Sequence, residues 1–232
     1  MSEPGSRRGR VHDAEGARQT ILDAAEEVFA EHGFDGARVD AIAKVSGYNK
    51  SLIFQYFGDK LALYAAVNRR ADEQTRGWQN EALSALTTAP VVNAEQTKDL
   101  LQKYIGQYFD YLVEHPRILR IFNWELAEGW QTFSKILTER DFDDIDQFRP
   151  VFDKLQKAGL MRAEPNVFLQ FTAALFMCHV FLAIAPLYQH MLPSEDFDSS
   201  TALAQSKEFL IEFITNGLLL SGSGTKPKVR KR

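Results

Sequence analysis

Residues 38–60 read RVDAIAKVSGYNKSLIFQYFGDK. The pattern predicts a short helix, a three-residue turn and a second helix, which is the layout of a DNA-reading helix-turn-helix. Gly47 supplies the left-handed backbone that ends the first helix, and Asn49 is a good N-cap for a second helix that begins at Lys50. The exposed first turn of that second helix is the part that such motifs insert into the major groove.

Apolar residues on both helices indicate the core behind this motif. Ile42 is expected on the inner face of the first helix, beside Ala43, which is small enough to let another helix approach. Ile53 and Phe57 are four residues apart on the second helix, so both can face the core. The segment therefore predicts one buried face and one free face.

Two quoted segments resemble a known family. Residues 47–60, with Tyr56-Phe57 followed by Asp59-Lys60, and residues 18–34, RQTILDAAEEVFAEHGF, are similar to the TetR/AcrR family of bacterial one-component transcriptional regulators. The resemblance covers Ala17 to Leu63. The chain departs from the family pattern at Arg38, where Ser or Thr usually caps the helix, and at Leu52 and Phe54 of the reading helix.

The proposed DNA contacts follow from the free face and from the resemblance. Lys50 and Ser51 are expected at base edges, and Leu52 at a thymine methyl unless it belongs to the core. Tyr48 either packs on the DNA or only shields the turn. Arg38, Tyr56 and Lys60 are better suited to phosphates. The predicted DNA-binding set is Arg38, Tyr48, Asn49, Lys50, Ser51, Leu52, Tyr56 and Lys60.

Composition and charge are consistent with a cytoplasmic DNA-binding protein. The 232-residue chain has a net charge of −4, yet residues 38–60 carry four basic residues against two acidic ones. The lone Cys178 allows no intrachain disulfide and favours a reducing compartment. The first ten residues contain no apolar core for a secretory signal.

Periodicity and breakers predict an all-α chain with no alternating strand pattern. We expect helices over residues 14–31, 60–86, 95–114, 116–128, 144–158, 166–189 and 199–220, with an aromatic stretch over 130–138. The predicted organisation is a disordered basic arm (1–13), a helix-turn-helix DNA-binding domain (14–60), a larger helical-bundle domain for ligand binding and dimerisation (61–221), and a disordered basic tail (222–232).

Residues 171–187 are almost wholly apolar. This run is shorter than the ~20 residues of a membrane span, and Pro186 lies near its end, so we expect no membrane segment. With the final helix, it resembles the helix pair through which the family forms homodimers. The predicted interface residues are Phe181, Leu203, Leu210, Phe213 and Ile214.

The resemblance also implies a small-molecule effector bound in the second domain. Aromatic side chains are dense there, with a few polar residues among them, as in a ligand pocket, although core packing explains the same pattern. The candidate effector residues are Tyr108, Phe109, Asn123, Trp124, Trp130, Phe133, Phe176 and His179. They suggest an apolar or aromatic effector.

The function expected from these features is a ligand-responsive repressor that binds a near-palindromic, double-stranded operator as a dimer. An effector-independent architectural DNA-binding protein and a helical-bundle enzyme are the alternatives. For an enzyme the chain lacks a Glu-x-x-His pair and a Walker-type phosphate loop. The five histidines have no metal-like spacing, so we expect no catalytic residues, metal or cofactor.

Overall fold

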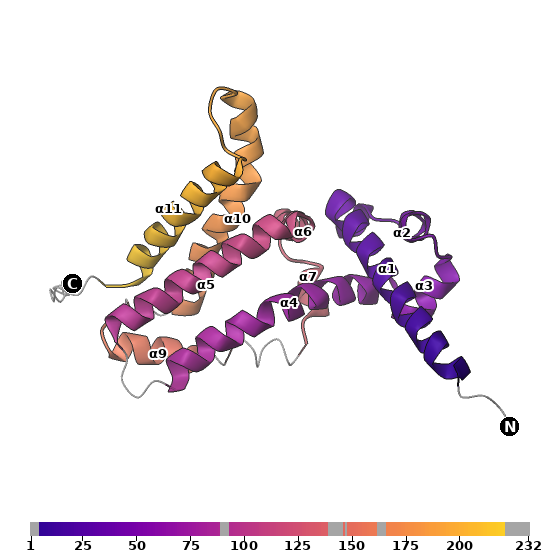
Figure 1. Ribbon diagram of the computed structural model, residues 1–232, viewed down its shortest axis with the longest axis horizontal. Helices are drawn as coiled ribbons and strands as arrows, with labels where there is room; N and C mark the ends of the chain where they lie inside the picture. The colour runs from indigo at the N-terminus through magenta and orange to yellow at the C-terminus, as the bar shows by residue number, and fades with distance from the viewer. Residues whose placement is uncertain (1–4, 89–92, 139–145, 147, 162–165, 221–232) are drawn as a thin grey trace. The chain divides into compact units, whose positions relative to one another are not determined.

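The computed structural model describes residues 5–88, 93–138, 146, 148–161 and 166–220, without the side chains of 5–13, 83 and 86–88 (Figure 1). In this part of the chain every regular element is a helix, which confirms the all-α prediction. The chain divides into two compact units. The first comprises residues up to Thr75 together with His115–Thr138, and the second comprises Arg76–Glu114 and the residues from Glu139 onward.

The first unit contains six helical segments (Figure 1). They are α1 (Gly5–Gly36), α2 (Val39–Ser46), α3 (Lys50–Phe57), the first half of α4 (Lys60–Thr88), α6 (Pro116–Ala127) and α7 (Phe133–Ile136). The first residues of α1 thus fall in the segment expected to be an arm. Asp59 caps α4 as its position suggests, because its Oδ1 accepts a 2.7 Å hydrogen bond from the backbone N–H of Ala62.

The core of the first unit is built on one face of α1. Ile21, Leu22, Ala25, Val28 and Phe29 are all buried there, at the 3- and 4-residue spacing that defines a helix face. Phe29 meets Tyr64 of α4 edge to face, with ring centroids 4.9 Å apart. This face therefore holds α1 against the start of α4.

Helix α6 packs against α1, although 79 residues of chain lie between Gly36 and Pro116. At Gly33 the backbone has φ 66°, and a Cβ there would lie 3.1 Å from the indole of Trp124. The same indole donates through Nε1 to the backbone carbonyl of Ala30 at 3.2 Å. Glycine at this position thus allows both the break in α1 and the close approach of α6.

The second unit contains the remainder of α4 with α5 (Ala94–Glu114), α9 (Arg149–Lys157), α10 (Val167–Met191) and α11 (Ser200–Leu218). Pro150 lies in the first turn of α9, where proline is tolerated. Part of the helix expected over 144–158 lies outside the described residues, as does the tail from 222. Ser199 caps α11, accepting a hydrogen bond from the backbone N–H of Ala202.

The contact between α5 and α11 is close because Gly106 has no side chain. A Cβ at Gly106 would meet the side chains of Ile211 and Lys207 at 3.2 and 3.3 Å. Lys207 also forms an ion pair with Asp110, one turn further along α5, at 2.6 Å. These contacts fix the face that α11 presents to its own chain.

Residues predicted at a dimer interface occupy different environments in the single chain. Leu210 and Ile214 are buried, only 3% and 2% exposed, so within one chain they are core residues. Phe181 and Leu203 are half-buried. Phe213 is 53% exposed, and its ring stacks on that of Phe209, which is 62% exposed. The large apolar residues that α11 exposes are therefore Phe209 and Phe213.

Candidate nucleic-acid interface

The helix-turn-helix has the geometry expected from the sequence. Gly47 ends α2 with φ 75° and ψ 3°, and its N–H donates to the carbonyl of Ala43 at 3.0 Å. The Oδ1 of Asn49 accepts a 2.9 Å hydrogen bond from the backbone N–H of Leu52. The turn is thus fixed at both ends by local backbone chemistry.

The inner face of the motif is firmly held. Ile42 of α2 and Ile53 of α3 are almost completely buried, and Phe57 is also in the core. The guanidinium of Arg18 lies over the ring of Phe57, 5.1 Å from its centroid. The buried side chains of Ile53 and Phe57 hold one face of α3, so its opposite face is a rigid surface.

The first turn of α3 is open to solvent at the predicted reading positions. Lys50 and Ser51 are exposed, and Leu52 is half-buried, so part of its side chain remains available. The side chain of Asn49 is used to cap the helix. A base-reading role for Asn49 would have to compete with this cap.

An ion pair that the sequence did not reveal lies at the start of α3. Nζ of Lys50 is 2.8 Å from Oδ1 of Asp40 in α2. The two residues are ten apart and on different helices, so no local spacing predicts the contact. Both side chains are about half exposed or more, and such pairs contribute little to stability. A phosphate or a guanine edge could therefore replace Asp40 at small cost.

Two side chains predicted to contact phosphates, Arg38 and Lys60, differ in the contacts that they already make within the chain. Arg38 is exposed, and its side chain makes no capping bond to α2, as expected from the missing Ser or Thr. Lys60 is already engaged: its Nζ lies 4.5 Å from the ring centroid of Phe34 and 3.4 Å from the carbonyl oxygen of Asp35. Burial lowers the pKa of Lys60, and the nearby Asp35 carboxylate partly offsets this.

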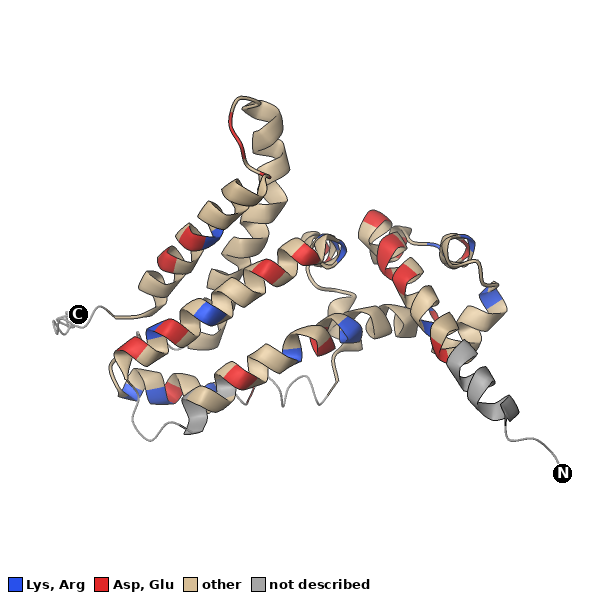
Figure 2. Cartoon of the chain, in the orientation of Figure 1, with Lys and Arg blue, Asp and Glu red and all other residues tan. Residues whose placement is uncertain are grey.

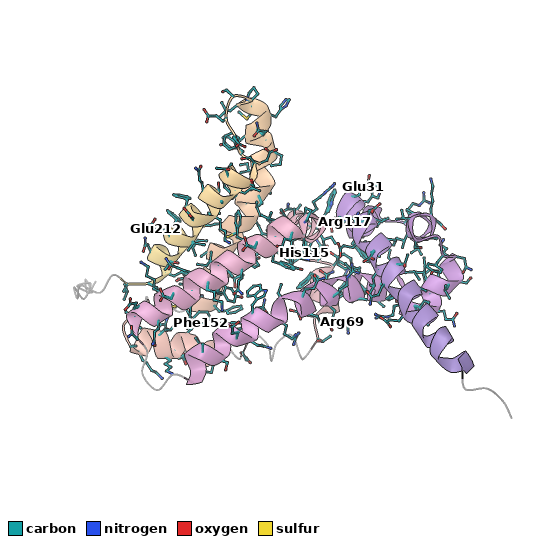
Figure 3. The ribbon with its side chains drawn as sticks, in the orientation of Figure 1. Glu31, Arg69, His115, Arg117, Phe152 and Glu212 are labelled. Carbon is teal, nitrogen blue, oxygen red and sulfur yellow. The ribbon has the colours of Figure 1, made fainter. Side chains whose placement is uncertain are left out.

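The two predicted tyrosines are both half-buried. The backbone N–H of Tyr48 donates to Oγ of Ser46 at 3.3 Å, which braces the turn. Tyr56 borders an open groove that Arg18 and Arg69 also line. Arg69, labelled in Figure 3, is exposed on α4. Basic side chains thus continue beside the end of α3.

Charge is unevenly placed on the first unit. Figure 2 shows a basic position at the start of α3, whereas acidic residues mark the second half of α1. Several of these acids are already paired, Asp23 and Glu26 with Arg70 and Glu27 with Arg117. Paired acids repel a polyanion less than free ones do, so this arrangement tolerates DNA at α3.

The predicted effector residues are divided between the two units. Asn123, Trp124, Trp130 and Phe133 belong to the first unit, and Tyr108, Phe109, Phe176 and His179 to the second. In the second unit the Tyr108 hydroxyl lies 3.1 Å from Nδ1 of His179, and Phe176 stacks on the same imidazole. A separate apolar cavity in that unit is lined by other residues, on α4, α5, α9, α10 and the end of α11.

Comparisons with known proteins agree with this geometry. Residues 21–67 match the sequence pattern of the bacterial regulatory proteins of the tetR family. The chain is 34% identical over 118 residues to the HTH-type transcriptional repressor SCO4008 of Streptomyces coelicolor, covering 51% of this chain and 54% of the repressor. It is 27% identical to the HTH-type transcriptional repressor NicS of Pseudomonas putida, over 77% of this chain and 76% of NicS.

A solved TetR-family transcription regulator from Marinobacter aquaeolei has the same fold, with a TM-score of 0.62 over 91% of this chain and all of that one, at 18% identity. The chain spans about half the length of SCO4008. Fold, motif and matched segment together identify a helix-turn-helix of the kind found in DNA-binding transcriptional regulators. Over residues 21–67 the chain is similar to the tetR family of bacterial regulatory proteins.

Proposed function

We propose that this protein is a dimeric repressor that binds a near-palindromic operator and is released from it by a small apolar or aromatic effector. The observation that carries the proposal is the exposed first turn of α3, held by a capped and buried helix-turn-helix. The similarity to SCO4008 and NicS, both named as transcriptional repressors, supports the repressor role.

A second copy of the chain is the partner that we propose for α10 and α11. Both helices expose large apolar side chains. On α10 they recur at spacings of three and four residues, which places them along one side of the helix: Val180, Ile184, Leu187 and Met191. On α11 they are Phe209 and Phe213. A self-complementary apolar face of this kind suits a two-fold interface. Dimerisation matters because two reading helices can recognise two half-sites about one helical turn (~34 Å) or a multiple apart.

Helix α10 is also long and apolar enough to cross a membrane, judged by length and composition alone. Apolar helices in the core or interface of a globular protein meet the same test. DNA is the partner that the family defines, so we assign α10 to the subunit contact and the protein to the cytoplasm.

Release by an effector requires two conformations. A ligand shifts the equilibrium only if it binds the DNA-incompetent conformation more tightly than the competent one. We propose that the ligand binds in the second unit. Within this unit we favour the apolar cavity as the binding site, in place of the aromatic residues predicted from the sequence.

The function can be tested by selecting genomic fragments that bind the purified protein and footprinting the best of them. We expect protection of two inverted half-sites and a complex of two chains. Protection of a single unsymmetrical site would contradict the dimeric model of binding. Equal affinity for selected and random duplex would instead favour an architectural DNA-binding protein.

A further inference from the structure

The described residues that line the apolar cavity of the second unit carry no charge. The cavity is lined by twelve described residues, and none of them is Asp, Glu, Lys, Arg or His. Phe152 of α9, labelled in Figure 3, forms one wall, with Leu155 of the same helix and Phe171 of α10. An ionised group in this cavity would lose its hydration and find no opposite charge among these residues, which is strongly unfavourable.

Among these twelve residues, two side chains carry a hydroxyl, those of Thr97 and Tyr104 on α5. The Thr97 hydroxyl is satisfied, because it donates to the carbonyl of Asn93 at 2.8 Å. The Tyr104 hydroxyl has no hydrogen-bond partner among the residues that the structure describes, although Tyr104 is buried. Because Tyr104 lines the cavity, its hydroxyl can donate to a ligand there, so a ligand with an oxygen that accepts this hydrogen bond would be favoured.

Tyr104 is held in place and remains a donor. Its ring lies between the rings of Trp78 and Phe171, with centroid distances of 4.9 and 5.6 Å. Burial raises the pKa of Tyr104 well above its usual value, so the phenol stays protonated at neutral pH. The cavity thus offers one fixed donor in an otherwise apolar environment.

We propose that the effector is an uncharged, mainly apolar molecule with one oxygen that accepts a hydrogen bond from Tyr104. This inference rests on the proposed ligand-responsive function and defines the chemistry of its ligand. Carboxylates and ammonium compounds of similar size are excluded by the uncharged walls.

The size of the cavity links binding to a movement of its walls. Its volume is about 50 Å³, whereas an apolar cavity that binds benzene measures ~150 Å³. Occupancy must therefore widen it. Two lining residues, Met161 and Leu219, pair in an isolated antiparallel bridge, and the N–H of Leu220 donates to the carbonyl of Leu160 at 2.8 Å. Widening acts on this bridge at the end of α11, the helix that carries Phe209 and Phe213.

The test compares two eight-carbon probes on the full-length protein by titration calorimetry at pH 7.5. We expect 2-octanone to bind and octanoate to bind at least ~10-fold more weakly, because only octanoate carries a charge. Tyr104→Phe keeps the ring and removes the donor, and should weaken ketone binding ~3- to 10-fold. Tyr108→Phe is the matched control: its hydroxyl faces His179, outside the cavity lining, so affinity should not change.

Thermal unfolding of each variant checks that it is folded. Octanoate binding as tightly as the ketone, no ketone binding at all, or equal losses from Tyr104→Phe and Tyr108→Phe would each overturn the inference. Operator affinity, measured in parallel by fluorescence anisotropy, separates this result from the proposed function. Selective ketone binding that depends on Tyr104 but leaves operator affinity unchanged supports the cavity chemistry and contradicts the release mechanism.

Discussion

The hydroxyl of Tyr64 in α4 donates a 2.6 Å hydrogen bond to Oε1 of Glu125 in α6, and each residue is only 1% exposed. The second carboxylate oxygen of Glu125 accepts from the backbone N–H of Phe133 at 3.0 Å. A buried carboxylate is tolerated when its oxygens are satisfied in this way. The pair therefore ties α6 and the start of α7 to the helix that follows the DNA-reading motif.

Removing this donor should destabilise the first unit. Tyr64→Phe leaves one oxygen of Glu125 buried without a partner, and we expect a loss of about 1–3 kcal/mol in the free energy of unfolding. Urea denaturation measures it. Tyr188→Phe, at an exposed position on α10, is the control and should change stability by less than about 0.5 kcal/mol. Identical urea midpoints for the two variants would refute the structural role of the pair.

Because Lys50 and Asp40 form an ion pair, removing the charge of one and of the other should have opposite effects on DNA binding. Lys50→Ala should weaken binding to the selected operator about 10-fold and relax preference at one base pair, because a base-edge donor is lost. Asp40→Asn should strengthen binding severalfold, since it frees Lys50 and removes a negative charge near the phosphates.

Anisotropy titrations against operator and random duplex measure both effects. Lys44→Ala, an exposed lysine on α2, controls for the loss of one positive charge. A loss for Lys50→Ala that is equal on operator and random DNA would show that Lys50 contacts phosphate only.

Leu210 is buried and Phe213 is exposed, so substitutions at these two positions should affect folding and dimerisation separately. Phe213→Glu places a charge on the exposed face of α11, so we expect a folded monomer that binds the operator at least ~10-fold more weakly. Leu210→Glu places the charge in the core and should unfold the chain. Glu212→Gln, at the exposed neighbouring position in Figure 3, is the control. Sedimentation velocity and circular dichroism distinguish these outcomes, and a stable dimer of Phe213→Glu would exclude this face.

The burial of His179 should make the free energy of unfolding depend on pH. Burial lowers the pKa of His179 from its usual 6.5 to about 4, although a hydrogen bond from the imidazole to the backbone carbonyl of Leu175 partly opposes this. Between these values the unfolded chain binds a proton that the folded chain does not, so stability falls as pH falls from about 6.5 to about 4. The loss reaches about 3 kcal/mol.

Urea unfolding at several pH values measures this slope. His179→Gln should have a smaller slope over the same interval, because the titrating group is gone. A variant whose slope equals that of the unchanged protein would show that His179 does not cause the loss.

Local chemistry explains why the helix-turn-helix was predictable. Gly47, Asn49 and Asp59 act on backbone groups within four residues of themselves, and each adopts the expected role. The buried positions Ile42, Ile53 and Phe57 follow from helical spacing alone. These signals require no knowledge of distant parts of the chain.

Contacts between distant segments were not predictable in the same way. The pairing of Lys50 with Asp40 and of Tyr64 with Glu125 depends on how helices pack, which periodicity does not specify. Aromatic density did not locate the cavity either: Trp124 and Trp130 belong to the first unit, while the cavity is lined by aliphatic residues and a few rings such as Tyr104 and Phe152. Apolar spacing identifies α11 as amphipathic without telling which apolar residues face their own chain.

The late position of α6 in the chain has a consequence for biosynthesis. The core around α1 needs Trp124 and Glu125, which the ribosome delivers only after α5 has been made. During synthesis the first unit therefore cannot complete these contacts until about residue 138 has emerged from the ribosomal exit tunnel. An amino-terminal fragment that stops before α6 would lack both hydrogen bonds, so we expect a shortened translation product to hold its DNA-reading helices less firmly than the full chain does.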